Sequence, residues 1–145
     1  MGANEKILLA LKSAATYLEN SIRALAKKDE NSLTANVWHV AAELEYALFM
    51  FSIAFEEEAD KLKLRSNPRL KKVEVDSALI TVRELLKAVF KHMKEKDLLE
   101  AYKEANIARH YMLKVQRDFA RKKREALKAK EAKKKATPPR KSSSP

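Results

Sequence analysis

The sequence contains no cysteine, a single glycine (Gly2) and four prolines, three of which lie in its last eight residues. The absence of cysteine excludes disulfides, thiolate metal ligands and cysteine nucleophiles. With so little glycine the chain cannot form a glycine-rich phosphate-binding loop, and it lacks the residues that tight turns between strands require. At 145 residues the chain is long enough for one domain with a real core. The composition therefore predicts a single all-α domain.

A long uncharged run is also missing. The longest uncharged run that is almost wholly apolar, residues 46–55, is far shorter than the roughly 20 residues that span a bilayer. The N-terminus makes a poor secretory signal, because no basic region precedes its apolar residues and Lys12 interrupts them. We therefore expect an intracellular, cytoplasmic protein without a membrane segment. High Lys, Glu and Arg content with a single Gln is typical of a thermophile-like composition.

Two segments in the first half of the chain have helical periodicity. The first runs from about residue 4 to residue 27 and carries one apolar stripe: Ile7, Leu11, Ala14, Leu18, Ile22 and Leu25. A short polar turn at residues 27–31 predicts an antiparallel hairpin. Asn31 or Ser32 is the expected N-cap of the second helix. We expect that helix to continue past the acidic residues 56–58 and to end within residues 62–72, where Pro68 cannot continue it.

A second hairpin follows. The third helix is predicted from about Asp76, on a stripe formed by Val75, Leu79, Val82, Leu86, Val89 and Met93. After a turn at residues 94–97, Asp97 and Glu100 resemble a capping box at the start of the fourth helix. That helix has its own stripe: Leu98, Tyr102, Ala105, Ala108, Met112, Val115 and Phe119.

The apolar stripe of the fourth helix stops at Phe119, but helix-favouring residues continue to Ala136. The predicted fold is all-α, a four-helix up-down bundle of two hairpins whose last helix extends into a basic arm. We assign residues 1–118 to the bundle, 119–136 to a projecting basic helix and 137–145 to a disordered tail.

Residues 32–55 are apolar on nearly every side of a helix, and between residues 35 and 55 only Glu43 and Glu45 are charged. Such a helix is predicted to be enclosed by other helices at the centre of the bundle. Its aromatic residues are interpreted as core, with a ligand pocket as the alternative: Trp38, Tyr46, Phe49, Phe51 and Phe55. If this helix binds anything, we expect the partner to be another helix.

The polar residues of the helices do not form a recognisable catalytic or metal site. His39 and Glu43 have the spacing of a metal-binding pair, but they supply only two ligands. Glu43 and Glu45 point about 200° apart on a helix and so cannot act as one acid–base pair. We expect each glutamate to reach the rim of the bundle or to pair with a basic neighbour, and His39, His92 and His110 to be structural or solvated. The sequence therefore predicts no enzyme activity, metal or cofactor.

Residues 17–48, YLENSIRALAKKDENSLTANVWHVAAELEYAL, resemble the first hairpin of HEPN-type helical bundles. The resemblance implies a helical bundle that acts in nucleic-acid transactions or in toxin–antitoxin pairs. Nuclease members of that family carry an Arg followed a few residues later by a His on a late helix. Here Arg83 and His92 are too far apart, and Arg109 and His110 are adjacent. The resemblance therefore does not extend to nuclease activity.

The net charge of +11 is concentrated towards the C-terminus. Residues 114–141 contain thirteen basic and three acidic residues, a net charge of +10, whereas the rest of the chain contains eighteen and seventeen. A merely solvated helix would place acids among its bases at i,i+4. The uncompensated charge favours an anionic partner. A membrane surface would need an apolar face, and after Phe119 only Leu127 and alanines offer one.

Nucleic acid needs no apolar face, because phosphate contacts release counterions whatever the sequence. We therefore predict a non-catalytic protein that binds the RNA or DNA backbone with weak sequence specificity, since the basic segment has no aromatic residue for base stacking after Phe119. The predicted contacts are Arg117, Arg121, Lys122, Lys123, Arg124, Lys128, Lys130, Lys133, Lys134, Lys135, Arg140 and Lys141. The alternative is a HEPN-like protein-interaction module, possibly dimeric, as a toxin–antitoxin or complex subunit, in which the aromatic residues of the second helix face a protein partner.

Overall fold

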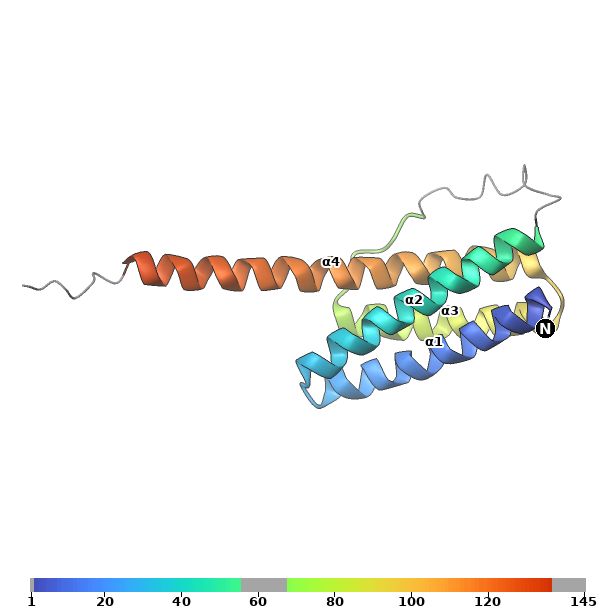
Figure 1. Cartoon of the computed structure of the whole chain (residues 1–145), viewed down its shortest axis with the longest axis horizontal. Coiled ribbons are helices and arrows are strands. Elements are labelled where there is room, and N and C mark those ends of the chain that lie inside the picture. Colours follow the sequence, from blue (N-terminus) through green and yellow to red (C-terminus); the bar gives the residue numbers. More distant parts are fainter. Residues whose placement is uncertain (1, 56–67, 137–145) are drawn as a thin grey trace, which may run out of the picture.

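The computed structural model describes residues 2–55 and 68–136, and in that part of the chain every regular element is a helix. The helices are α1 (Ala3–Ala26), α2 (Glu30–Ala54), α3 (Val75–Lys94) and α4 (Leu98–Ala136). α1 pairs with α2 and α3 pairs with α4, and the two hairpins meet through α2 against α4 and α1 against α3 (Figure 1). The predicted all-α bundle of two hairpins is confirmed.

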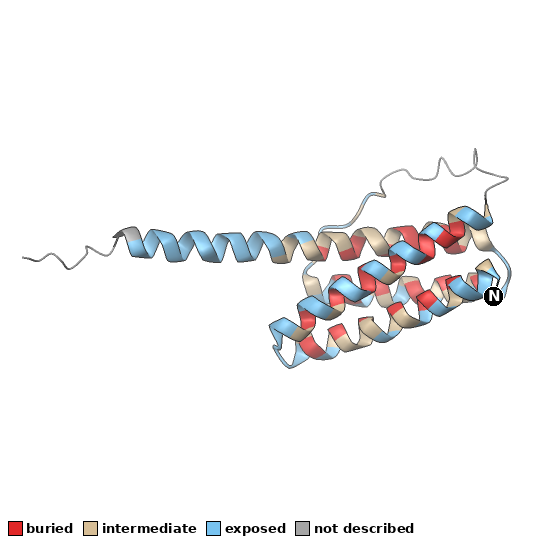
Figure 2. Ribbon diagram, in the orientation of Figure 1, coloured by how far each residue is buried: buried red, intermediate tan, exposed pale blue. Residues whose placement is uncertain are grey.

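The apolar stripes of the four helices face the inside of the bundle (Figure 2). The largest side chains with almost no exposure come from all four helices: Phe51, Ile7, Leu11, Leu18, Leu44, Leu79, Met112, Val37, Val40, Val82, Val89 and Val115. Fully burying a side chain of this kind contributes roughly 1.5–3 kcal/mol. Tertiary packing of these stripes is therefore what stabilises the helices.

All neighbouring helices run antiparallel, but the consecutive helices α2 and α3 lie at diagonal corners and run in the same direction (Figure 1). The described part of the connection between them, residues 68–74, lies along α4, and we call it the strap. The backbone N–H of Lys71 donates to Tyr111 Oη at 3.3 Å, and Lys114 Nζ donates to the carbonyl oxygen of Lys71 at 3.2 Å. Leu70 and Val73 pack partly buried against the core. The strap is thus fixed to α4.

The two hairpins are closed by the same short turn. Lys28 (φ 58°) and Lys96 (φ 61°) adopt the left-handed conformation one residue after the C-caps of α1 and α3. The N–H groups of each lysine and of the following aspartate bond back to carbonyls of the last helical turn at 2.8 to 3.1 Å. This arrangement satisfies carbonyls that a helix end otherwise leaves free.

The aspartate of each turn then caps the next helix. Asp97 caps α4 as predicted, and accepts the backbone N–H three residues later at 3.3 Å. The prediction that Asn31 or Ser32 caps α2 was wrong, because the cap is Asp29, which accepts the Ser32 N–H at 3.2 Å. The left-handed Lys28 reverses the chain in fewer residues, so α2 begins earlier.

α2 also ends earlier than predicted. Its last helical residue is Ala54, and Phe55 is the C-cap. The last turn of α2 has no basic side chain to stabilise the negative end of the helix dipole. Extending the helix would add the three glutamates of residues 56–58 at that negative end, which is unfavourable. The predicted disordered tail, residues 137–145, lies outside the described residues, as do residues 56–67.

α2 is not enclosed on every side, and here the sequence-based prediction was wrong. Val37, Leu44 and Phe51 are buried, whereas Trp38 and Phe49 are each 59% exposed. α1 and α4 cover two sides of α2, but α3 lies at the diagonal corner and leaves the outer side open. Among the described helices, α2 alone is long and apolar enough to cross a membrane. A core helix of a bundle can have the same length and composition, and 44% of the most apolar segment of α2 is buried within the bundle.

Candidate nucleic-acid interface

α4 is 39 residues long and continues beyond the bundle. Val115 is its last buried residue in the described chain, Phe119 is half-buried, and residues 120–134 are all exposed. We call residues 119–136 the arm. With a rise of 1.5 Å per residue the arm is about 27 Å long, and it projects from one end of the bundle (Figure 1).

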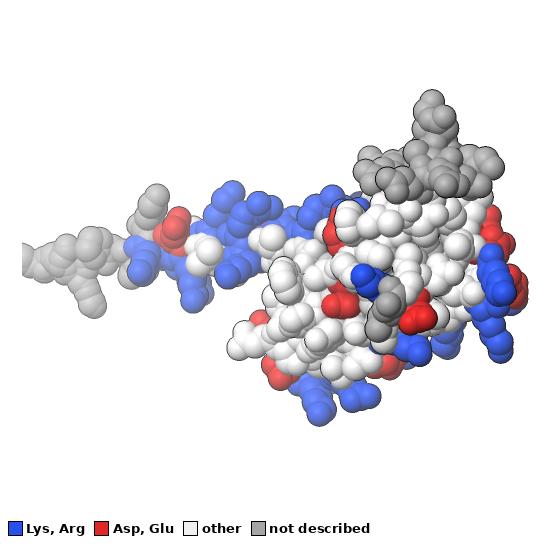
Figure 3. All heavy atoms as spheres, turned by 45° about the vertical axis from the view of Figure 1, so that its right-hand side comes forward, with Lys and Arg blue, Asp and Glu red and all other residues white. Residues whose placement is uncertain are grey.

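The arm carries basic side chains on all sides. Within residues 121–134 there are two acidic residues, Glu125 and Glu131, and eight basic ones: Arg121, Lys122, Lys123, Arg124, Lys128, Lys130, Lys133 and Lys134. Figure 3 shows this positive surface along the arm. Arg121 pairs with Asp118 at 3.5 Å and with Glu125 at 4.0 Å. Exposed pairs of this kind contribute only about 0.3–0.5 kcal/mol, and the arm keeps a large positive excess.

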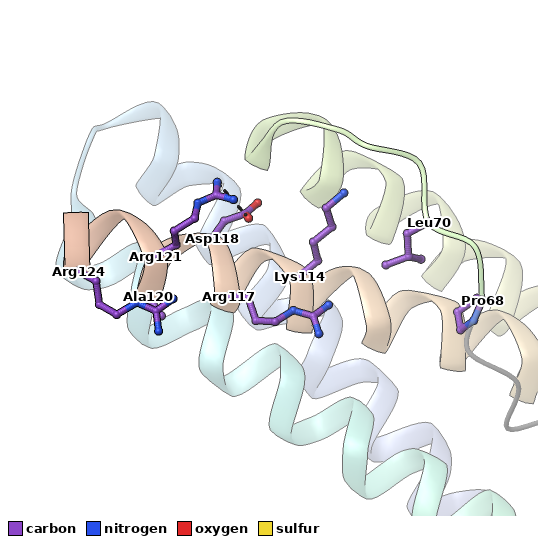
Figure 4. A pocket seen from close by; sticks show the side chains of 8 residues that line it. All are labelled: Pro68, Leu70, Lys114, Arg117, Asp118, Ala120, Arg121 and Arg124. Carbon is purple, nitrogen blue, oxygen red and sulfur yellow. Dashed lines mark ion pairs between the residues drawn. The ribbon is translucent and has the colours of Figure 1, made fainter. Parts of the chain in front are cut away.

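One row of cations connects the arm to the bundle. Spacings of three and four residues place these cations on one face of α4, which we call the basic stripe: Lys114, Arg117, Arg121, Arg124 and Lys128. The first four line an open hollow of about 670 Å³ together with Asp118 and Ala120 of α4 and with Pro68 and Leu70 of the strap (Figure 4). The sequence-based prediction included the stripe from Arg117 onwards and missed Lys114.

The strap adds cations that the sequence-based prediction did not include. Arg69, Lys71 and Lys72 are exposed, and the hydrogen bond from Lys114 to the Lys71 carbonyl holds this segment against α4 just before the arm. These residues are more than forty positions from the stripe in sequence, so no local pattern connects them to it. The run RLKK after Pro68 was the signal that could have found them.

The predicted contact residues are only partly within the described chain. Arg117, Arg121 to Arg124, Lys128, Lys130, Lys133 and Lys134 are exposed. Lys135 belongs to α4, but its side chain lies outside the described part of the chain, as do Arg140 and Lys141. That these side chains bind nucleic acid stays a prediction.

Each of the three histidines contacts another residue of the protein. The His39 ring stacks on Tyr17 with 4.5 Å between ring centroids. His92 Nε2 lies 3.4 Å from Glu104 Oε1, and His110 Nδ1 lies 2.8 Å from the carbonyl oxygen four residues earlier. Among the described residues no group of three or more His, Cys, Asp and Glu side chains is arranged to hold a metal ion.

The two glutamates of α2 differ in their surroundings. Glu45 forms an ion pair with Arg109 of α4, which confirms the expectation that it pairs with a basic neighbour. Glu43 is half-buried on another side of the helix.

The aromatic residues of α2 do not share one environment. Phe51 packs edge-on against Tyr102 in the core, with 5.8 Å between ring centroids, whereas Trp38 and Phe49 face solvent.

No family model matches this chain, and no curated protein or solved structure matches it either. The resemblance of the first hairpin to HEPN-type bundles therefore stays a prediction.

Proposed function

We propose that this protein is a non-catalytic nucleic-acid-binding protein whose arm contacts the phosphates of RNA or DNA. The observation that supports this most strongly is an exposed helix with eight basic and two acidic residues over residues 121–134. Like charges at this density repel one another along the helix. Polyanionic phosphate relieves that repulsion and releases its own counterions.

The chemistry of the arm favours the backbone over the bases. Its only exposed large apolar side chain in the described part is Leu127. Its one aromatic residue, Phe119, packs partly buried against the core, and no aromatic residue follows it on which a base could stack. Lys and Arg contacts to phosphate position a protein without reading sequence. A helix with side chains is about 10–12 Å across, which suits the roughly 12 Å wide major groove of B-DNA.

The basic stripe and the strap give the arm a fixed base on the bundle. Arg117 and Lys114 belong to the bundle-packed part of α4, and the strap holds further cations beside them. A strand of nucleic acid lying along the arm would therefore meet cations continuously from the strap to the end of the described helix. The bundle supplies the rigid body that orients the arm.

The test is a fluorescence anisotropy titration of duplex DNA and of structured RNA with the full chain at several salt concentrations. If about six phosphates are neutralised, the affinity should fall on the order of a thousandfold between 50 and 200 mM salt. A chain that ends at Phe119 keeps every residue that is buried in the described part of the chain, and it should remain helical by circular dichroism but lose binding. Binding that ignores salt, or that survives this truncation unchanged, would refute the proposal.

A further inference from the structure

α2 presents a continuous apolar face to solvent. Trp38 and Phe49 are each 59% exposed, Tyr46 is 45% exposed and Ile53 is 44% exposed. Ala42 between them, and Ala35 one turn before Trp38, are also exposed. Because these six residues recur every three or four positions, they lie on one side of the helix, which we call the α2 face.

The α2 face is large enough for an interface. Four side chains at about half exposure, each offering about 200 Å² when free, present roughly 400 Å² of surface. Single exposed apolar residues are common, whereas a contiguous patch of roughly 400 Å² has the size of the largest apolar patch on a typical monomer, and that patch is often functional. Two copies packed on this face would bury about 800 Å² from these four side chains alone, and the alanines and the flanking residues add to that area, towards the roughly 1,200 Å² at which stable interfaces begin.

We propose that the α2 face is the contact between two copies of this chain, packed antiparallel about a two-fold axis at Ala42. The pattern is symmetric about this residue: Trp38 and Tyr46 lie four positions away on either side, and Ala35 and Phe49 lie seven positions away. A two-fold interface needs such a self-complementary surface, because every contact occurs twice.

The antiparallel arrangement places small residues against large ones. The two-fold rotation places each residue of the second copy on the opposite side of Ala42 along the helix axis, but at the same edge of the interface. Phe49 therefore meets Ala35 and Trp38 of the second copy, and Tyr46 meets its His39. Ala42 meets its own counterpart, and so small a residue at the crossing lets the helices approach to about 8 Å.

The charges around the α2 face fit a second copy in this orientation. The face itself has no Lys or Arg, and Glu45 at its edge is already paired with Arg109 of α4, so its burial leaves no lone charge. α4 runs antiparallel to α2 (Figure 1). The two-fold axis therefore directs the two arms away from each other, whereas parallel packing would bring two positive arms side by side.

The first experiment measures the mass of the full chain by light scattering. We expect the wild type at twice the chain mass of 16.6 kDa, and Ala42→Arg at the chain mass with an unchanged circular dichroism spectrum, since position 42 is exposed in one copy. The matched control is Ile80→Arg, an exposed apolar position on α3 at the diagonal corner, and it should stay dimeric. A wild-type monomer at every concentration, or a dimer that Ala42→Arg leaves intact, would overturn the proposal.

The second experiment tests the orientation and uses the absence of native cysteine. Across the axis Ala42→Cys should form a disulfide-linked dimer on mild oxidation, because its two copies approach within the Cα separation a disulfide allows. Trp38→Cys should not form a disulfide between the two chains, because antiparallel packing holds the two substituted positions far apart. Ile80→Cys, which lies outside the α2 face, is the negative control. Linkage through Trp38→Cys instead would overturn the antiparallel axis. The chain could instead be a monomer in which Trp38 fluorescence shifts to the blue only when anionic vesicles are added. That result would show that the α2 face binds a lipid surface, and it would overturn the proposal of a second copy.

Discussion

Neutralising the basic stripe should change the salt dependence of nucleic-acid binding by an amount that the structure sets. The variant replaces four exposed cations on one face of α4 with glutamine: Arg117, Arg121, Arg124 and Lys128. Each neutralised phosphate contributes about −0.9 to the slope of log affinity against log salt concentration. For about six phosphates the slope is near −5, and with four contacts removed it should be near −2. The loss of affinity between 50 and 200 mM salt should then shrink from about a thousandfold to about tenfold.

The assay is anisotropy with a labelled duplex over that salt range, with circular dichroism to confirm the helix content. Because the four side chains are exposed, their replacement should leave the core intact. A matched control removes the same amount of charge from exposed positions on α1 and α3: Lys6, Lys12, Lys91 and Lys94. A stripe variant that keeps the wild-type slope, or a control variant that loses as much as the stripe variant, would refute a contact centred on the stripe.

Two further predictions concern stability, and both are measured by urea denaturation. Replacing Lys28 or Lys96 with Gly should stabilise the fold by about 1 kcal/mol, because both lysines have a positive φ that a side chain disfavours; a loss of stability in both variants would contradict this reading of the turns. Phe51→Ala should destabilise by about 3–5 kcal/mol, because the side chain is fully buried and packs on Tyr102. The comparison is Leu9→Ala on α1, which is 51% exposed and should change stability by less than about 0.5 kcal/mol; equal effects would contradict the assigned core.

The parts of the fold that depend on neighbouring residues could be predicted from the sequence. The stripe of α3, from Leu79 to Met93, faces the core because helical spacing alone places those side chains on one side. Asp97 caps α4 through a bond to an N–H three residues away. The arm was predictable for the same reason, since its charge and the end of the apolar stripe at Phe119 are both features of a single segment.

The surface of α2 is the clearest case where the sequence was not enough. A helix that is apolar on nearly every side has no periodic signal to say which side faces the core. Val37 and Trp38 are adjacent and both apolar, yet one is fully buried and the other is mostly exposed. The packing of α1 and α4 decides this, and the diagonal position of α3 leaves the outer side of α2 open.

The full extent of the candidate interface was also decided by tertiary structure. The sequence by itself determined the four helices, the two hairpins and the basic end of α4, because each depends on spacing and charge within a short segment. It did not determine that Lys71 of the strap lies against Lys114, a contact between residues 43 positions apart. Nor did it determine that Trp38 and Phe49 would remain outside the core. Both depend on how complete helices pack against one another, and that packing brings together or separates residues that no local pattern relates.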